Sequence, residues 1–221
     1  MPNSSGPVFD LAARLVEVGH QRFVTTYYGT PWSTAYPTCT TQSSVARDHV
    51  GTLHPPIRTG LHMTFTPNPE LDLVLERTVP VSPQKVWAAW TEPELLLQWF
   101  TPAPFKTVKV EQDLRPGGAN CITMESPEGH QFPNAGCYLV VEPNRLLVFT
   151  SVMGADFRPL VAGPGDLPFT GRIEIAPAPG GGTLYRAIAM HADADAARRH
   201  SEMGFHAGWG AALDQLVALM S

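Results

Sequence analysis

Histidines and acidic residues gather near the C-terminal end of the chain, in a composition typical of metal ligands. His191, His200 and His206 lie there with Asp193 and Glu202. Two ligands on one helix need a spacing of three or four residues, whereas His200 and His206 are six residues apart and fall on different faces. Glu202 and His206 share a face, but two ligands do not complete a site. We therefore expect no metal ion and interpret these histidines as buried or solvent-exposed structural residues.

Catalysis by acid–base or nucleophilic chemistry has little support in the residue pattern. A general acid or base would be a carboxylate or histidine held in a cavity with a shifted pKa, and His191, His206 and Glu125 are the candidates. The G-x-S-x-G pattern of a nucleophilic serine is absent from the sequence. Two glycine clusters, at 163–165 and 180–182, read as turns because neither stands between a strand and a helix. The sequence thus assigns no catalytic residue.

The overall composition excludes several classes of partner. The 221 residues include 15 Lys and Arg against 20 Asp and Glu, a formal net charge of −5. Nucleic acids and anionic membranes are recognised by clustered positive charge, so neither is an expected partner. The apolar stretches are shorter than the roughly 18–20 residues of a membrane-spanning helix, so we expect no membrane insertion. Three cysteines are too few for a disulfide framework and no secretory signal is visible, which favours a cytoplasmic location.

The composition changes near Met63 and divides the chain into two parts. Residues 1–62 hold few charges, and the stretch 25–62 is rich in Thr, Ser, Pro and Gly. Prolines at this density interrupt both helices and strand ladders, so we expect a poorly ordered extension. One hypothesis is that Met63 is an alternative start and the extension a non-native leader. Residues 63–221 are then predicted to form a single folded domain.

From residue 71 onward the sequence predicts regular elements. Alternating apolar and polar residues at 71–76 indicate a strand. Ser82-Pro83 and Glu92-Pro93 each place a proline at a first helical position, which predicts two short helices that end near Phe100. Six further strands are predicted between turns rich in Gly, Pro and Asn, at 108–114, 121–126, 136–142, 145–153, 169–176 and 183–190. Strands joined by short turns, with no helix between them, imply an antiparallel sheet.

The last segment, from Asp193 to Met220, predicts the longest helix. Its apolar and small residues recur every three or four positions and form one stripe, at Ala196, His200, Met203, Ala207, Gly210, Leu213 and Val217. Three glycines, Gly204, Gly208 and Gly210, lie within it, although each costs about 1 kcal/mol relative to alanine in a helix. Close approach to another element, or space left for a ligand, would explain them.

Five motifs in this order resemble those of a known superfamily. They are TVPVSPQKVWAAWTEPELLLQWF, DLRPGG, EPNRLLVFT, GGGTLYR and EMGFHAGWGAALDQL. Together they resemble the START-like (SRPBCC) helix-grip proteins, in particular the bacterial single-domain branch related to the C-terminal domain of the activator of heat shock protein 90 ATPase. The resemblance covers about residues 70–221. It implies an α+β fold in which a curved antiparallel sheet of six to seven strands wraps around a long C-terminal helix.

The helix-grip fold also implies a cavity between the concave sheet and that helix. The candidate wall residues are mainly aromatic side chains and methionines: Trp99, Phe100, Met124, Tyr138, Phe149, Tyr185, Met203 and His206. Such walls suit a flat apolar or aromatic ligand, because methionine adapts its shape and tyrosine can orient a polar group. For each residue the alternative is ordinary core packing.

The superfamily includes lipid and hormone carriers, polyketide cyclases, self-resistance proteins and co-chaperone domains, so fold alone names no activity. Our first prediction is a protein that binds a small hydrophobic molecule, lipid-like or aromatic, without a cofactor. The second is a cyclase-like or hydrolase-like enzyme that uses the same cavity. The third, a module that stimulates a chaperone ATPase, ranks lowest because residues 1–62 are too short to replace the N-terminal domain of the eukaryotic activators. The sequence leaves the choice between monomer and homodimer open.

Overall fold

The computed structural model describes residues 65–163 and 165–221. The predictions for residues 1–62, and the alternative start at Met63, lie outside the described residues. Within the described part of the chain, no helix is long and apolar enough to cross a membrane.

The two short helices lie directly after the first strand, β1 (Asp72–Val79), as predicted. They are α2 (Pro83–Thr91) and α3 (Pro93–Trp99). The Ser82 hydroxyl caps α2 by accepting a hydrogen bond from the Lys85 N–H, and proline lies in the first turn of both helices. Proline suits that position because its fixed φ is helical and its missing N–H would have no partner there. The local signals Ser-Pro and Glu-Pro therefore gave the correct helix starts.

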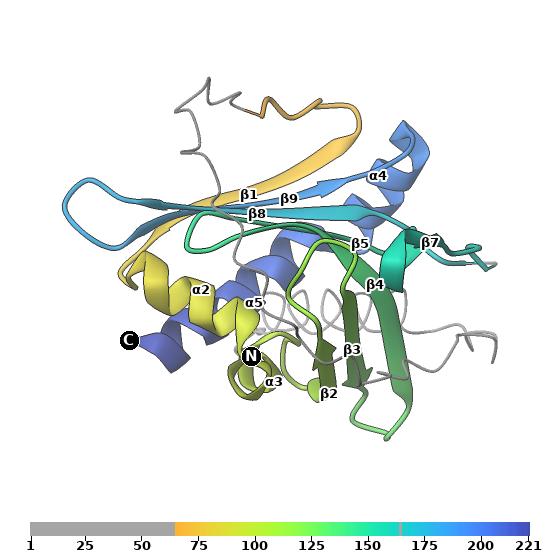
Figure 1. Ribbon diagram of the computed structural model, residues 1–221, viewed down its shortest axis with the longest axis horizontal. Coiled ribbons are helices and arrows are strands. Elements are labelled where there is room, and N and C mark those ends of the chain that lie inside the picture. The colour runs from red at the N-terminus through yellow and green to blue at the C-terminus, as the bar shows by residue number, and fades with distance from the viewer. Residues whose placement is uncertain (1–64, 164) are drawn as a thin grey trace, which may run out of the picture.

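Seven strands form one antiparallel sheet in the order β1-β9-β8-β5-β4-β3-β2 (Figure 1). Besides β1, they are β2 (Lys106–Gln112), β3 (Ala119–Glu125), β4 (Gln131–Glu142), β5 (Leu146–Thr150), β8 (Thr170–Pro177) and β9 (Thr183–Met190). The first and last strands of the sequence pair along their whole length, from Asp72 beside Met190 to Val79 beside Thr183. The predicted α+β fold with its antiparallel sheet is confirmed.

A small ribbon interrupts the connection between β5 and β8, where the sequence predicts a loop rich in glycine and proline. It consists of β6 (Met153–Gly154), a 3₁₀ turn η1 (Ala155–Phe157) and β7 (Arg158–Pro159). Asp156 and Phe157 both have positive φ values, 53° and 59°. The chain rejoins the sheet at β8.

The predicted helix from Asp193 to Met220 is broken into two helices, α4 (Ala194–Glu202) and α5 (Phe205–Met220). Gly204 separates them with a left-handed backbone, φ 96° and ψ 37°, which glycine adopts without a steric penalty. The break changes the direction of the helix, so the predicted stripe continues only in part. Leu213 is buried, whereas Ala207 is exposed. The expectation of one continuous helix was therefore wrong at this point.

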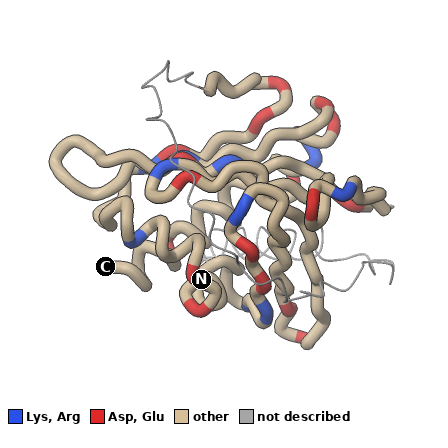
Figure 2. Tube along the Cα trace, viewed as in Figure 1, with Lys and Arg blue, Asp and Glu red and all other residues tan. Residues whose placement is uncertain are grey.

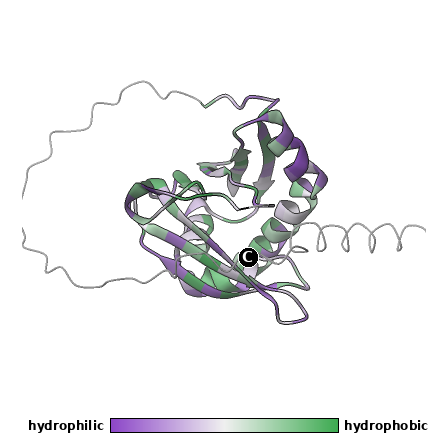
Figure 3. Ribbon diagram, turned by 90° about the vertical axis from the view of Figure 1, so that its right-hand side faces the viewer, coloured by the Kyte–Doolittle hydropathy of each residue, from purple (hydrophilic) through white to green (hydrophobic). Residues whose placement is uncertain are grey.

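The core lies between the inner face of the sheet and helices α2, α3 and α5. Along β8 and β9, buried Ile173, Ile175 and Ala187 alternate with Arg172 and Arg186 on the outer face. The two C-terminal helices differ in hydropathy (Figure 3): α4 is mostly hydrophilic, whereas the long helix α5 is more hydrophobic. Positions of opposite charge alternate along parts of the chain (Figure 2), and Glu174 pairs with both arginines. The buried apolar residues of α5 face the sheet across the core.

Candidate ligand cavity

A cavity of about 320 Å³ lies between the sheet, helix α5 and residues 160–162 and 165–169 of the connection before β8. Its wall takes residues from α2, α3, β3, β4, β5, β9, α4 and α5, so that most of the fold contributes to it. A volume of this size falls at the lower end of the roughly 300–1,000 Å³ that small-molecule sites occupy. The helix-grip arrangement therefore leaves space beside α5.

Six of the eight predicted wall residues lie on this cavity. They are Trp99, Phe100, Met124, Phe149, Tyr185 and Met203. These side chains come from α3 and the residue after it, from β3, β5 and β9, and from the end of α4, so local sequence alone does not bring them together. Tyr138 and His206 are not on its wall.

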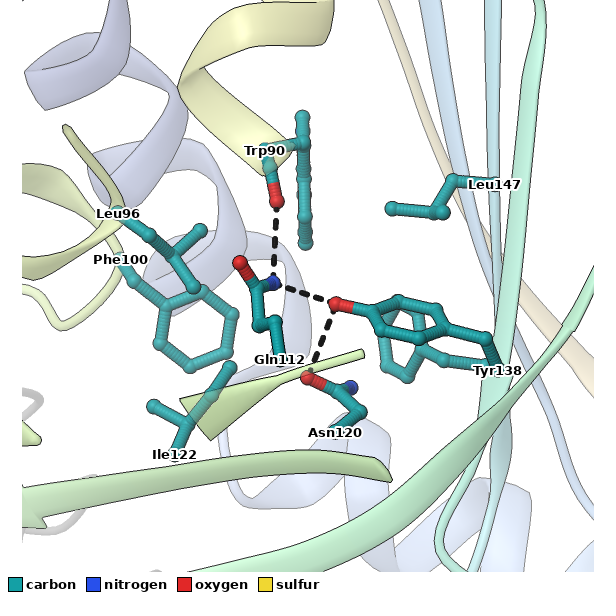
Figure 4. A pocket seen from close by; sticks show the side chains of 9 residues that line it. Trp90, Leu96, Phe100, Gln112, Asn120, Ile122, Tyr138 and Leu147 are labelled. Carbon is teal, nitrogen blue, oxygen red and sulfur yellow. Dashed lines mark hydrogen bonds between the residues drawn. The ribbon is translucent and has the colours of Figure 1, made fainter. Parts of the chain in front are cut away.

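Tyr138 lines a separate void of about 10 Å³ and takes part in a hydrogen-bond network there (Figure 4). Its hydroxyl donates to Asn120 Oδ1 at 3.2 Å and accepts a hydrogen bond from Gln112 Nε2. The same amide nitrogen donates to the Trp90 carbonyl oxygen at 3.2 Å. Burial raises the pKa of Tyr138 well above its ordinary value, although the bond from Gln112 opposes this. The neutral phenol therefore has a structural role in fixing α2 to β2 and β4.

His206 is exposed on α5, and its Nε2 lies 3.2 Å from the Val74 carbonyl oxygen on β1. Its side chain therefore lies outside the cavity, contrary to the prediction. The reason is the break at Gly204, which changes the face that residue 206 presents.

Several wall residues were missed from the sequence, and they include the aromatic side chains of Trp90, Phe169 and Trp209. Trp90 follows the buried Val86 by four residues on α2, so helical spacing could have found it. Phe169 ends a loop rich in glycine and proline, where no periodicity indicates which way a side chain faces. Trp209 lies after the unpredicted break, so its face could not be derived from the stripe.

The aromatic side chains contact one another and form a rigid wall. The Trp90 ring lies 4.9 Å from that of Trp99 in an edge-to-face arrangement, 6.0 Å from Phe100 and 6.1 Å from Phe149. Trp99 is held further by a hydrogen bond of 2.9 Å from its Nε1 to the Ala89 carbonyl oxygen. Aromatic pairs in such geometries contribute about 0.5–1.5 kcal/mol beyond the burial of area. The wall is thus preorganised and apolar.

Two buried polar side chains lie at the end of the cavity formed by α2 and β9. Tyr185 is only 2% exposed, and burial raises the pKa of its phenol well above the ordinary range. The Trp90 indole lies close to this phenol and partly opposes the rise in its pKa. The Trp90 Nε1–H nevertheless forms no hydrogen bond with any described atom. Buried polar groups are nearly always hydrogen-bonded, so this end of the cavity offers donors to a guest molecule.

A pair of buried histidines lies behind the opposite end of the cavity. His191 Nδ1 is 2.9 Å from the Leu71 carbonyl oxygen, and its Nε2 is 2.8 Å from His200 Nδ1. Because a carbonyl only accepts, His191 Nδ1 carries the proton, and His200 Nδ1 donates to His191 Nε2. Burial, and secondarily the neighbouring ring of His191, lowers the pKa of His200 to about 3. His200 is therefore a neutral donor at physiological pH.

No cluster of three or more metal-binding side chains occurs among the described residues. The histidine pair is accounted for by the hydrogen bonds to Leu71 and between the two rings, and His206 lies apart from it on α5.

The comparison with known families decides the classification of the chain. A family model described as Activator of Hsp90 ATPase homolog 1-like protein matches residues 80–221. The chain belongs to this family. The predicted membership of the SRPBCC superfamily and its helix-grip fold are both confirmed.

Solved structures of similar proteins agree with the family assignment. Protein NE0264 from Nitrosomonas europaea is 43% identical, with a TM-score of 0.65 over 69% of this chain and 95% of that chain. Protein CV1439 from Chromobacterium violaceum is 25% identical, with a TM-score of 0.54 over 70% and 98% of the two chains. Protein Ms6760 from Mycobacterium smegmatis, 24% identical with a TM-score of 0.57 over 69% and 91%, shares the fold. No curated protein matches the chain.

Proposed function

We propose that this family member binds a small, largely apolar molecule in the cavity of about 320 Å³. The observation that carries the proposal is the wall itself, in which the rings of Trp90, Trp99, Phe149 and Trp209 surround an unfilled space. Apolar walls with few polar groups are typical of small-molecule sites, and flat rings favour lipid-like or aromatic guests. The cytoplasmic location and the oligomeric state stay predictions.

An enzyme of the cyclase or hydrolase kind is the second candidate, and it has less support. General acid–base catalysis needs a titratable side chain that reaches the guest. Of the three candidates from the sequence, His206 is exposed, Glu125 forms an ion pair with Lys106, and His191 is bonded to Leu71 and His200. A chaperone-activating module ranks below both, because the observations above concern an internal space and not an exposed surface.

The proposal is tested with the full chain and the neutral fluorescent probe N-phenyl-1-naphthylamine. Probe fluorescence should rise and saturate on titration with protein, because the probe leaves water for an apolar site. Ala212 lies on α5 at the cavity wall and is 8% exposed, so Ala212→Leu places extra volume in the cavity. We expect this variant to bind the probe at least about tenfold more weakly and to keep or raise its melting temperature, since filling a cavity stabilises a fold.

The matched control is Ala218→Leu, the same change at an exposed position of the same helix. It should leave both the affinity and the melting temperature unchanged. The proposal is wrong if the probe shows no saturable binding, or if both variants bind it as tightly as the wild-type chain does.

A further inference from the structure

The polar groups of the cavity differ between its two ends, which bears on the kind of ligand it takes. At the end formed by α2 and β9, the Tyr185 side chain lies on the wall and is almost completely buried. The Trp90 Nε1–H beside it has no acceptor among the described residues. An oxygen of a guest molecule at this end of the cavity can therefore accept hydrogen bonds from the Trp90 indole and from the Tyr185 phenol.

Arg199 lies at the other end of the cavity, on α4, where the wall is exposed to solvent. Its guanidinium group forms no ion pair with any described carboxylate. The preceding residue, Arg198, pairs with Asp195 at 3.0 Å and with Glu202 at 3.2 Å. Arg199, the arginine on the cavity wall, is therefore available to pair with an anionic group of a ligand.

Asp166 is the acidic side chain on the same wall, and it has to be weighed against Arg199. Its Oδ2 accepts a hydrogen bond of 2.6 Å from the Gly163 N–H, which uses the carboxylate to close the loop before β8. An anionic ligand can therefore pair with Arg199, which forms no ion pair with a described residue. A cationic ligand would have to compete for Asp166 with the hydrogen bond from Gly163.

The two polar residues belong to elements at different ends of strand β9. Tyr185 lies near the start of β9, and Arg199 belongs to the helix that follows its end at Met190. The five residue steps from Tyr185 to Met190 span about 17 Å of extended chain. Between them lie the rings of Trp209 and Phe149, so the middle of the cavity is apolar.

We propose that the ligand is an elongated amphipathic organic anion. Its acidic group binds Arg199 at the rim, its apolar body lies along the aromatic wall, and an oxygen at its far end accepts the Tyr185 hydroxyl proton. The proposal rests on the proposed function and specifies the chemical class of its ligand.

Calorimetric titration of the full chain with four ten-carbon probes tests this assignment. Decanoate carries the anion alone, 10-hydroxydecanoate adds the distal oxygen, 1-decanol lacks the charge, and decylammonium reverses it. We expect 10-hydroxydecanoate to bind best, decanoate about threefold to tenfold more weakly, and the other two more weakly still. Added salt should weaken the binding of both anions, because Arg199 is exposed and its charge is screened.

Two variants locate the contacts. Arg199→Gln should reduce the affinity for decanoate about threefold to tenfold without changing that for 1-decanol, whereas the control Arg198→Gln should change neither. Tyr185→Phe should remove the advantage of 10-hydroxydecanoate over decanoate and leave decanoate binding as it was. The comparison of these two probes on the wild-type chain tests the distal contact even if Tyr185→Phe fails to fold.

The outcomes separate the two proposals. Equal affinities for decanoate and 1-decanol, or a decanoate affinity that Arg199→Gln leaves unchanged, would overturn the anion assignment while the cavity still binds. A preference for decylammonium would overturn it in favour of Asp166. No binding of any of the four probes, together with no binding of N-phenyl-1-naphthylamine, would overturn both.

Discussion

Acidification should destabilise this protein through one side chain, His200. Its ring is fully buried, donates to His191 Nε2, and lies 5.2 Å from each of the Phe169 and Phe205 rings. A proton added to the ring would place a charge among apolar groups and beside a second histidine. The unfolded chain accepts that proton readily, because the ordinary pKa of histidine is 6.5.

The magnitude follows from proton linkage. The folded-state pKa of His200 is lowered to about 3, so between pH 6.5 and pH 3 the unfolded state binds one more proton than the folded state. The contribution to stability is fully present above pH 6.5 and falls by about 1.4 kcal/mol for each pH unit below it. From pH 7 to pH 5 the loss amounts to about 2 kcal/mol. This figure depends only on the unfolded pKa as long as the folded one stays below 5.

Urea unfolding followed by tryptophan fluorescence at pH 7, 6 and 5 measures this loss. The informative variant is His200→Gln, whose amide can still donate to His191 but does not titrate. It should be less stable than the wild type at pH 7 because its fit is poorer, and its free energy of unfolding should fall about 2 kcal/mol less on going to pH 5. His130→Gln, the same change at an exposed position, should keep the wild-type pH dependence.

The reasoning would be refuted by parallel stability curves for the wild type and His200→Gln. A second measurement does not require that variant to fold. In the wild-type chain, the His200 ring signals observed by NMR should show no titration between pH 7.5 and pH 5. A midpoint near 6.5 would show that the buried ring accepts a proton and would remove the basis of the prediction.

Two further predictions concern glycines. Gly204→Ala should destabilise the fold by about 1–2 kcal/mol in thermal unfolding, because alanine is strained at φ 96°. The control Gly210→Ala lies inside α5 with open space around it, and it should be neutral or stabilise by up to about 1 kcal/mol. In Gly171→Ala, a Cβ would lie 2.4 Å from the Phe149 ring, so this ring must move toward the cavity; we expect a loss of about 1–3 kcal/mol and weaker binding of N-phenyl-1-naphthylamine.

The elements that the sequence predicted well are those with local causes. The Ser-Pro and Glu-Pro signals specify the starts of α2 and α3 through capping and a fixed φ, and neither depends on distant residues. Alternation along β1 predicts that strand, and the turns rich in Gly and Pro predict the bounds of β8 and β9. The family motifs implied an antiparallel sheet around a C-terminal helix, but the pairing of β1 with β9 was not predicted, since local patterns cannot give a pairing between such distant segments.

The features that were not predicted from the sequence share one physical origin. In each case tertiary contacts decide between local conformations that the sequence allows equally well. Gly204 is compatible with a helix interior and with a left-handed break, and helical periodicity cannot distinguish the two. Once the break is present, His206 turns outward and Trp209 joins the cavity wall. Six of eight wall residues nevertheless lie on the cavity, because five belong to strands or short helices whose inner faces do not depend on that break.

Tyr138 and Tyr185 are both buried tyrosines on strands, yet their hydroxyl groups have different surroundings. Tyr138 meets Gln112 and Asn120, whose side chains satisfy its hydroxyl, whereas Tyr185 faces the space beside Trp90. The family resemblance implied both as candidate wall residues but could not tell which one finds a polar neighbour across the sheet. That distinction depends on side chains far apart in the chain, and it separates a residue that holds the fold together from one that we propose contacts a ligand.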